Sequence, residues 1–206
     1  MTLIAFGPLS VHVDDQVLRP RTWTLLQAQW VAEIEGSLPT GAIAELCSGA
    51  GHIGQAAASL SGRALVQVDV DPHACGLARG NAERNRLAER VEVRCGDLSD
   101  ALRAEERFAA VLADPPYLPS SEVGAWPDDP LLAIDGGDDG LELLRRCIEV
   151  ARRHLSPGGV VLLQTAGRRQ LDALTPEIST AGLGCVEVRE VDDDRAVGLL
   201  RAAELR

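Results

Sequence analysis

The sequence contains no lysine, because all twenty of its positively charged residues are arginine. This absence excludes mechanisms that need a lysine amine, such as Schiff-base chemistry or the phosphate-binding lysine of a P-loop. The formal net charge is −11 at neutral pH. A surface for duplex nucleic acid needs clustered positive charge, so this balance argues against such a partner.

Long apolar runs and paired cysteines are also missing. No run is long enough to span a bilayer and the sequence shows no signal peptide, so we expect a cytoplasmic protein with no membrane partner. The five cysteines form no C-x-x-C pair; they are Cys47, Cys75, Cys95, Cys147 and Cys185. Dispersed cysteines favour small buried thiols in a reducing compartment, and we expect no metal.

The length of 206 residues predicts one domain, with an N-terminal extension over 1–40 and a core over 41–206. In the extension, the alternating run Leu9–Val13 predicts a hairpin strand, with its turn at Asp14–Asp15. The apolar spacing of Leu25–Ile34 predicts an amphipathic helix with Thr22 or Thr24 near its N-cap.

From residue 42 onward, strand and helix patterns alternate. The expected strands cover 42–46, 64–68, 91–95, 109–112 and 160–164, and residues 185–191 and 196–200 form a closing hairpin. The expected helices cover 52–60, 72–85, 99–105, 141–154 and 168–181, with Ser156–Gly159 ending the fourth. This order predicts a Rossmann-like, doubly wound α/β fold: a seven-stranded, mostly parallel sheet with an antiparallel C-terminal hairpin.

The stretch Asp114–Tyr117 follows a short apolar run and therefore lies at the carboxyl end of an expected strand. Open α/β sheets bind ligands at that edge. Its two prolines stiffen the loop and remove two N–H donors. Asp114 and the Pro115 carbonyl can accept hydrogens from an N–H-bearing substrate group, over which Tyr117 can stack. The alternative is a proline-rich turn with a solvated aspartate.

A glycine-rich loop follows the first core strand. Gly49, Gly51 and Gly54 spell G-x-G-x-x-G, and Asp69 follows Gly49 by twenty residues at the end of the second strand. This pattern alone is the dinucleotide fingerprint, so NAD is one candidate cofactor. Glu45 ends the first strand; it would disfavour a pyrophosphate but would suit the ammonium or sulfonium of S-adenosylmethionine.

The segment from Glu45 to Gly51 is similar to the acid-x-Gly-x-Gly-x-Gly motif of class I methyltransferases, with Cys47 in place of the first glycine. Under this interpretation the glycines allow a close backbone approach to the cofactor. Asp69 then accepts the ribose hydroxyls, in competition with Asp71, and Asp97 accepts the adenine amino group. The alternative is that these acids are only solvated strand ends.

With these residues in place, the sequence resembles the HemK/PrmC-type methyltransferases, which modify the side-chain amide of a protein glutamine. Residues 17–24 are similar to the family's V-L-I-P-R-P-E-T segment, 114–117 to its N-P-P-Y motif, and 132–141 to its A-L-D-G-G-x-D-G-L element. The resemblance implies S-adenosylmethionine as cofactor. It places Arg21 near the methionine carboxylate, and Thr24 and Asp114 in the same cofactor site.

The sequence departs from the family in three respects. The helical domain that holds the release factor in bacterial members has no counterpart before residue 40, and the shorter archaeal and eukaryotic relatives use a small partner protein. Asp114 replaces the usual asparagine, which is more typical of methylation at amino groups of bases or amines. Trp23 and Leu25 replace two glutamates of the family pattern.

These observations favour an N-methyltransferase acting on a protein side-chain amide, such as that of a release factor, with Asp114, Pro115 and Tyr117 as catalytic residues. One alternative acceptor is a small-molecule amine or a nucleobase; another reading is a cofactor-binding subunit that needs a partner. The loop over 118–140 contains six acidic residues and no arginine. It would repel a phosphate backbone and attract a basic peptide within a Debye length of about 8 Å.

Overall fold

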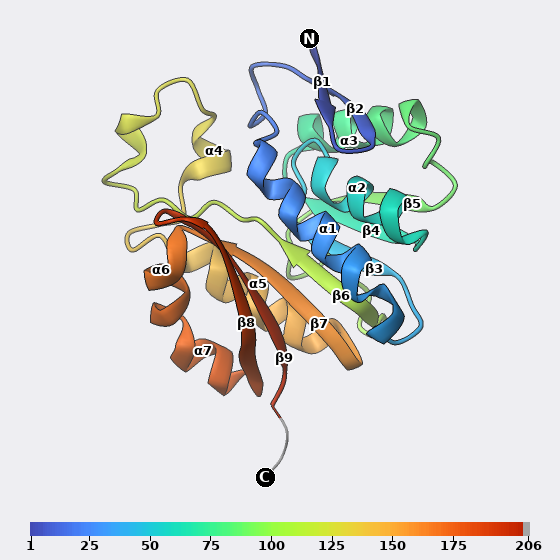
Figure 1. Cartoon of the computed structure of the whole chain (residues 1–206). Helices are drawn as coiled ribbons and strands as arrows, with labels where there is room; N and C mark the ends of the chain where they lie inside the picture. The colour runs from blue at the N-terminus through green and yellow to red at the C-terminus, as the bar shows by residue number, and fades with distance from the viewer. Residues whose placement is uncertain (204–206) are drawn as a thin grey trace.

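The structure is a computed structural model that describes residues 1–203, and its centre is a seven-stranded sheet (Figure 1). The strand order is β5-β4-β3-β6-β7-β9-β8. The first five of these strands are parallel and β9 runs antiparallel to both neighbours, which confirms the predicted Rossmann-like sheet. Their bounds are β3 Ile43–Leu46, β4 Leu65–Asp69, β5 Val91–Cys95, β6 Phe108–Ala113, β7 Leu155–Thr165, β8 Leu183–Asp192 and β9 Arg195–Ala202.

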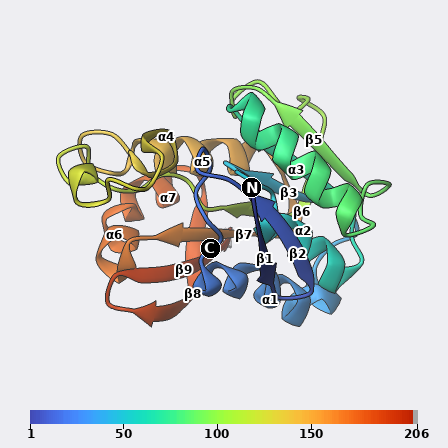
Figure 2. The same ribbon diagram turned by 90° about the horizontal axis from the view of Figure 1, so that it is seen from above.

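Helices cover both faces of this sheet (Figures 1 and 2). One face carries α1 (Leu25–Ile34), α2 (His52–Ser61) and α3 (Pro72–Arg84), and the other carries α5 (Glu142–His154), α6 (Gly167–Ala173) and α7 (Thr175–Thr180). The short α4 (Leu131–Ile134) lies in the loop after β6, between the 3₁₀ turn Val123–Ala125 and α5. Two further 3₁₀ turns, Thr22–Thr24 and Glu35–Ser37, flank α1.

Two hydrophobic cores result from the alternation of side chains along each strand. In β6, Ala110 and Leu112 pack toward the core under α1 and α2, whereas Val111 and Ala113 pack toward the core under α5. Because both faces are covered, β6 is buried throughout its length. The residue that follows it, Asp114, is therefore the first polar group at the carboxyl edge of the sheet.

The N-terminal hairpin forms a separate two-stranded sheet of β1 (Thr2–Phe6) and β2 (Leu9–Val13). Its turn is Gly7–Pro8, so the expectation of a hairpin turn at Asp14–Asp15 is wrong; the chain instead leaves the hairpin there. Asn81 of α3 anchors β2, since its side chain accepts from the His12 N–H at 2.7 Å and donates to the Ala50 carbonyl at 3.0 Å. The hairpin is thereby fixed beside the glycine loop.

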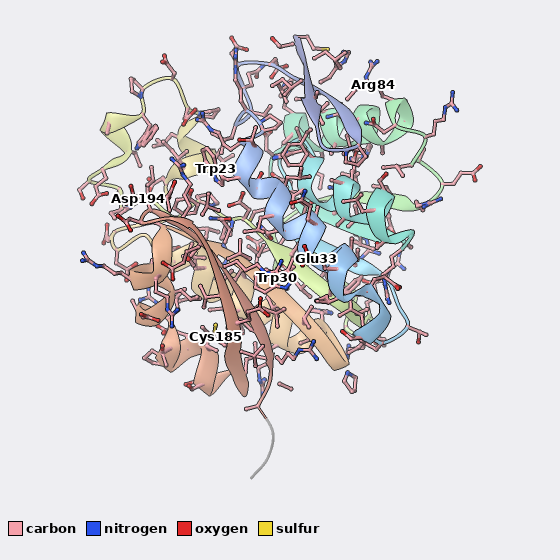
Figure 3. All side chains as sticks on the ribbon, in the orientation of Figure 1. Trp23, Trp30, Glu33, Arg84, Cys185 and Asp194 are labelled. Atoms are coloured by element: carbon pink, nitrogen blue, oxygen red, sulfur yellow. The ribbon has the colours of Figure 1, made fainter. Side chains whose placement is uncertain are left out.

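Helix α1 is anchored to the C-terminal strands through Trp30, which is fully buried (Figure 3). The guanidinium of Arg189 in β8 lies 4.1 Å from the centroid of the Trp30 ring and donates to Glu33 at 2.7 Å. Within residues 1–203, no helix is both long and apolar enough to cross a membrane.

Three expected elements differ from the structure. Residues 99–105 form turns, because the Asp97 carbonyl accepts the N–H groups of Asp100 and Ala101 and no helix continues from them. The helix expected over 168–181 is split into α6 and α7, with Pro176 in the first turn of α7. The segment Ser156–Gly159 belongs to β7, with a register shift opposite β6.

Candidate active site

A cavity of about 760 Å³ lies at the carboxyl ends of β3, β4, β5 and β6. Five of the residues predicted to be catalytic or to bind the cofactor line it: Cys47, Gly49, Asp69, Asp97 and Asp114. Helix α4, the start of α5 and the segment Gln16–Leu18 complete the wall. This is the edge of an open α/β sheet where ligands are expected to bind.

The loop between β3 and α2 contains three residues in the left-handed region. Cys47 has a φ of 56°, Gly49 a φ of 51° and Gly51 a φ of 83°. Glycine is required at position 51, since an added Cβ would lie 2.6 Å from the Gln55 Nε2. At Gly49 an added Cβ would meet nothing within 4 Å, so the backbone there faces open space. Cys47 pays a steric cost that the family glycine avoids.

Asp69 connects this loop to the end of β4. Its carboxylate accepts the N–H of Gly49 at 2.6 Å and the N–H of Asp71 at 3.0 Å. Burial raises its pKa above the ordinary value. The neighbouring Asp71 also lines the cavity, but its carboxylate caps α3 by accepting the N–H of His73 at 2.9 Å.

Glu45 lies beneath the loop instead of in the cavity wall, and only 2% of it is exposed. Its carboxyl group accepts the N–H of Gly54 at 3.0 Å and a hydrogen bond from the Gln67 side chain. Burial raises the pKa of Glu45 to about 8. The expected direct contact of Glu45 with a cationic ligand is thus replaced by a supporting role, and an alanine at 54 would drive its Cβ into this carboxyl group.

Asp97 is paired with a residue that the sequence reasoning missed, Arg146 of α5. The guanidinium donates to both carboxylate oxygens, at 2.6 and 2.7 Å, and this hydrogen bonding lowers the pKa of Asp97. Both residues line the cavity. An adenine amino group at Asp97 would therefore share its acceptor with Arg146.

Asp114 lines the cavity directly after β6. Burial raises its pKa to about 7, and no residue among 1–203 forms a hydrogen bond with its carboxyl group. Asp114 is half-buried, and a partly desolvated carboxyl without a protein partner is best satisfied by a polar ligand or by water. Asp114 is consequently available to a polar group that enters the cavity.

The two other residues expected to be catalytic lie outside the cavity wall. Pro115 is buried, and Pro116 lines the cavity in its place. Tyr117 is partly buried and packs against the core under α5, and burial raises the pKa of its hydroxyl. Its carbonyl accepts a hydrogen bond from the Gln170 side chain at 2.8 Å, which ties the loop to α6.

The segment that follows α4 holds the Asp114–Tyr117 loop from behind. Gly136 donates to the Leu118 carbonyl at 2.8 Å, and an added Cβ at Gly136 would lie 2.9 Å from the Pro116 carbonyl oxygen. Gly137 accepts the N–H of Ser120 at 2.9 Å. Gly136 and Gly137, which belong to the element over residues 132–141, therefore support the candidate catalytic loop through their backbone.

Besides Asp114, two fully buried polar atoms of residues in the cavity wall have no hydrogen-bond partner within residues 1–203: the Ser48 Oγ and the His52 Nδ1. Burial lowers the pKa of His52 to about 4, so its ring is neutral at neutral pH. Such orphaned groups are satisfied when a polar ligand occupies the site. The cavity volume, the open backbone at Gly49 and these two atoms fit a polar nucleoside-type cofactor. Ser48 could have been noticed in the sequence from its position inside the glycine loop.

The remaining predicted residues lie elsewhere. Arg21 donates to both oxygens of Asp129, at 2.8 and 2.9 Å, and faces a different cavity. Thr24 is buried and donates to the Arg21 carbonyl at 2.8 Å, although it occupies the N-cap position of α1. Neither they nor Gly51 line the main cavity, so a contact of Arg21 with a carboxylate there would require its ion pair to open.

Comparison with known families gives a match to the methyltransferase small domain over residues 27–125. This range contains the glycine loop, β4, β5, β6 and Asp114.

The chain is also similar to glutamine methyltransferases. It is 36% identical over 162 residues to the release factor glutamine methyltransferase of Gloeobacter violaceus. This alignment covers 76% of this chain and 56% of the relative. The chain is 30% identical over 207 residues to the ribosomal protein uL3 glutamine methyltransferase of Burkholderia pseudomallei, covering 94% of this chain and 66% of that relative. The chain thus spans between about half and two thirds of the length of these relatives.

Solved structures share the fold at low sequence identity. The human methyltransferase 10 domain containing protein aligns with a TM-score of 0.70 and 21% identity, over 93% of this chain and 87% of its own. The ribosomal protein L11 methylase of Lactobacillus delbrueckii subsp. bulgaricus aligns with a TM-score of 0.68 and 14% identity, over 94% and 86% of the two chains.

Proposed function

Since the chain belongs to the HemK/PrmC type of class I methyltransferases, we propose that it transfers a methyl group from S-adenosylmethionine to a side-chain nitrogen of a protein. The observation that carries the proposal is the half-buried carboxyl group of Asp114, which has no hydrogen-bond partner within residues 1–203 and lies in the same cavity as the glycine loop and Asp69. The catalytic core is assigned to residues 41–206 and the N-terminal extension to residues 1–40.

The cofactor contacts follow from the cavity wall. The open backbone at Gly49 and the neighbouring Cys47 take the methionine side of the ligand, Asp69 accepts the ribose hydroxyls, and Asp97 accepts from the adenine amino group. Glu45 and Gly51 act indirectly by holding the loop in shape. Arg21 and Thr24 stabilise the segment that leads into the Gln16–Leu18 wall.

Bound S-adenosylmethionine supplies a methyl group on a cationic sulfur, which leaves as a thioether. Asp114 accepts an N–H of the acceptor and orients its nitrogen toward that methyl, and such positioning can supply ~7–11 kcal/mol of the barrier. The nitrogen becomes cationic as its new bond forms, so the attraction of the carboxylate grows toward the transition state. Because its pKa is about 7, Asp114 is also suited to take the proton that the nitrogen loses. Pro115 and Tyr117 keep this loop rigid.

A protein glutamine is the acceptor class supported by the two groups of relatives, which are named for release factor and ribosomal protein uL3. Asp114 favours a second candidate, an amine acceptor, since it stands where the family pattern has asparagine. A carboxylate stabilises a cationic nitrogen more strongly than an amide does. The release factor and a small activating protein remain candidate partners of this chain.

The test is incubation of the purified chain with methyl-labelled S-adenosylmethionine and a fractionated cell extract, with Asp114→Ala as the matched inactive control. Label that depends on Asp114 and is released by protease supports the proposal. Label confined to nuclease-sensitive material or to small solutes contradicts it. If transfer occurs only when a second protein fraction is added, an activating partner is required.

A further inference from the structure

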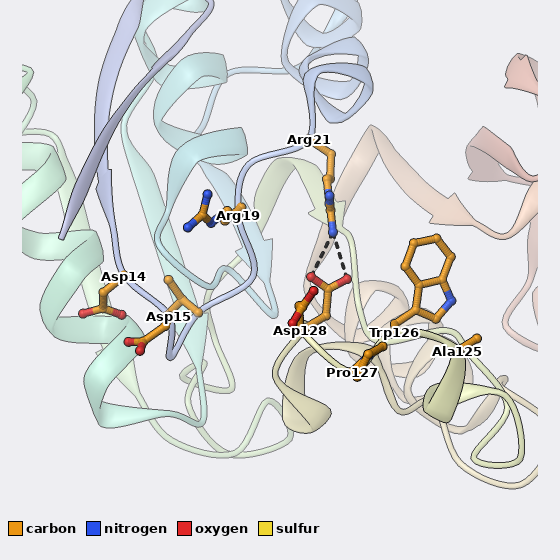
Figure 4. A pocket seen from close by; sticks show the side chains of 10 residues that line it. Asp14, Asp15, Arg19, Arg21, Ala125, Trp126, Pro127 and Asp128 are labelled. Carbon is orange, nitrogen blue, oxygen red and sulfur yellow. Dashed lines mark hydrogen bonds and ion pairs between the residues drawn. The ribbon is translucent and has the colours of Figure 1, made fainter.

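A second cavity, of about 620 Å³, lies beside the first and has no part in the chemistry described above. One wall is the segment that leaves the N-terminal hairpin, within residues 14–21, and the other is residues 125–129 of the loop after β6. Figure 4 shows Asp14 and Asp15 on one side and Trp126 on the other, with Arg21 between them. The guanidinium of Arg21 forms an ion pair with Asp129 at 2.8 Å.

The two cavities are adjacent. Val17 lines both of them. Arg19 and Asp129 line the second cavity, whereas their chain neighbours Leu18 and Pro130 line the first. A peptide that occupies the second cavity can therefore continue into the first, where Asp114 lies.

The charges in the second cavity are unbalanced. Its walls carry four carboxylates against two guanidinium groups. Asp14 is engaged by His73 at 2.9 Å and Asp129 by Arg21 at 2.8 Å. Asp15 and Asp128 have no ion-pair partner in the part of the chain that the structure describes. Arg19 has no ion-pair partner among the described residues either, so two free carboxylates face one free guanidinium and the excess charge of the cavity is negative.

An aromatic surface accompanies this charge. Trp126 is 48% exposed although it is a large apolar side chain, and it stands two residues before Asp128 in the rigid Trp-Pro-Asp sequence. A cationic side chain gains from lying over an indole ring, and it gains further from a nearby carboxylate. The Arg21–Asp129 pair holds the two walls together, so this arrangement exists before a partner binds.

We infer that the second cavity docks a cationic segment of the acceptor protein. An arginine or lysine side chain lies over Trp126 beside Asp128, and a neighbouring residue of the same segment delivers its nitrogen to Asp114. This inference rests on the proposed function, since it assigns the acceptor's flanking sequence. The excess of carboxylates disfavours a phosphate backbone in the same place.

The test uses fluorescence anisotropy of two labelled heptapeptides in the presence of S-adenosylhomocysteine. Both have a central glutamine; one has flanking arginines and the other has citrulline, the neutral isostere, at the same positions. We expect the arginine peptide to bind at least about fivefold more tightly, with an advantage that shrinks as salt is added. Trp126→Ala and Asp128→Asn should each remove most of that advantage while the calorimetric affinity for S-adenosylmethionine stays unchanged.

The matched control is Glu122→Gln, which removes one charge from the same loop outside both cavities and should leave the discrimination intact. Equal binding of the two peptides, or an arginine advantage that survives in both cavity variants, overturns the inference. So does displacement of the arginine peptide by a single-stranded oligonucleotide. Because anisotropy needs no turnover, tight arginine-dependent binding without any methyl transfer would contradict the proposed function and leave the docking site supported.

Discussion

Asp114 is half-buried at the cavity wall, and no residue within 1–203 forms a hydrogen bond with its carboxyl group. Its neighbours at the same edge of the sheet are all engaged, with Asp69 bound to the glycine loop and Asp97 to Arg146. In the proposed mechanism, this difference separates Asp114, which is left for the acceptor, from Asp69 and Asp97, which shape the cofactor end. Desolvation raises the pKa of Asp114 to about 7, which is near the pH at which enzymes are assayed.

We predict that Asp114→Ala abolishes methyl transfer and leaves the affinity for S-adenosylmethionine nearly unchanged. In the wild type, turnover should rise with pH through about 7, because the acceptor is oriented by the ionised carboxylate and burial raises the pKa of Asp114 to about 7. Asp114→Asn should lose this rise. The measurement is initial rate against pH for the three proteins. A flat wild-type profile, or an alanine variant with most of its turnover, would show that the loop is only structural.

For the cofactor end, we predict that Asp69→Ala weakens S-adenosylmethionine binding. The variant loses a ribose acceptor, and each hydrogen bond to a charged group is worth about 1.5–3 kcal/mol. It also frees the Gly49 N–H that Asp69 now accepts. Calorimetric titration measures the loss, and Asp100→Ala, a nearby acid outside both cavities, is the control. Equal affinity of Asp69→Ala and wild type would remove Asp69 from the site.

The sequence predicted residue types at this site better than it predicted their contacts. Asp69, Asp97 and Asp114 follow strand ends, so the parallel sheet alone brings them to one cavity. Glu45 is the penultimate residue of β3, yet its carboxyl group lies under the loop, where it bonds Gly54 and Gln67. Arg21 pairs with Asp129, a residue 108 positions away. No local sequence pattern predicts such a long-range pair, and none predicts Arg146 as the partner of Asp97.

At the scale of elements, the candidate catalytic loop depends on two separate supports. The backbone around Gly136 and Gly137 bonds to Leu118 and Ser120 from one side. The side chain of Gln170 in α6 donates to the carbonyls of Tyr117 and Gly140 from the other. The short helix α4 lies within the loop between these two supports, so the loop is held at both.

We predict that Gly136→Ala lowers turnover and stability together, by displacing the loop that carries Asp114. An added Cβ would lie 2.9 Å from backbone atoms of Pro116, Tyr117 and Gly140, none of which can move independently. Gly124→Ala is the control in the same loop, since a Cβ there meets nothing within 4 Å. The measurements are the steady-state rates and the thermal unfolding of both variants. If Gly136→Ala is as active and as stable as Gly124→Ala, the brace has no role.

The helices and strands were largely predictable, because apolar runs mark their interiors and glycines and prolines mark the turns between them. Helix α1 and strands β2 and β5 begin and end at the predicted residues. The predictions are wrong in segments whose secondary structure is determined by tertiary contacts. The expected helix over 99–105 is replaced by turns, in which Glu106 bonds the backbone N–H of Arg103 and the side chain of Arg94. Leu155–Gly159 joins β7 because β6 offers a pairing edge.

For the whole molecule, opposite pKa shifts predict how stability depends on pH. The pKa of Glu45 is raised to about 8 by burial, so its stabilising contribution is complete below its ordinary value of 4.5 and is lost as pH rises toward 8. The pKa of Glu106 is lowered to about 2 by hydrogen bonds from Arg94, so its contribution is present above 4.5 and is lost as pH falls toward 2. The Glu45 shift therefore destabilises the fold toward alkaline pH, and the Glu106 shift destabilises it toward acid pH.

We therefore predict that the free energy of unfolding declines between about pH 5 and pH 8, with a slope of at most about 1.4 kcal/mol per pH unit from each raised group. Glu45→Gln should flatten this decline, since an amide does not titrate. Urea unfolding at several pH values measures the slope, with Glu122→Gln as a surface control. A wild type that grows more stable up to pH 8, or an unchanged slope in Glu45→Gln, would show that Glu45 is ionised in the fold.

The central claim is that the cavity at the carboxyl edge of the sheet is an S-adenosylmethionine site and not a dinucleotide site, although the loop spells G-x-G-x-x-G. The most direct measurement is calorimetric titration of the chain with S-adenosylmethionine, S-adenosylhomocysteine and NAD under one set of conditions. We predict saturable one-to-one binding of the first two, reduced in Asp69→Ala, and no heat of binding for NAD. Tight NAD binding with no heat from S-adenosylmethionine would contradict the claim.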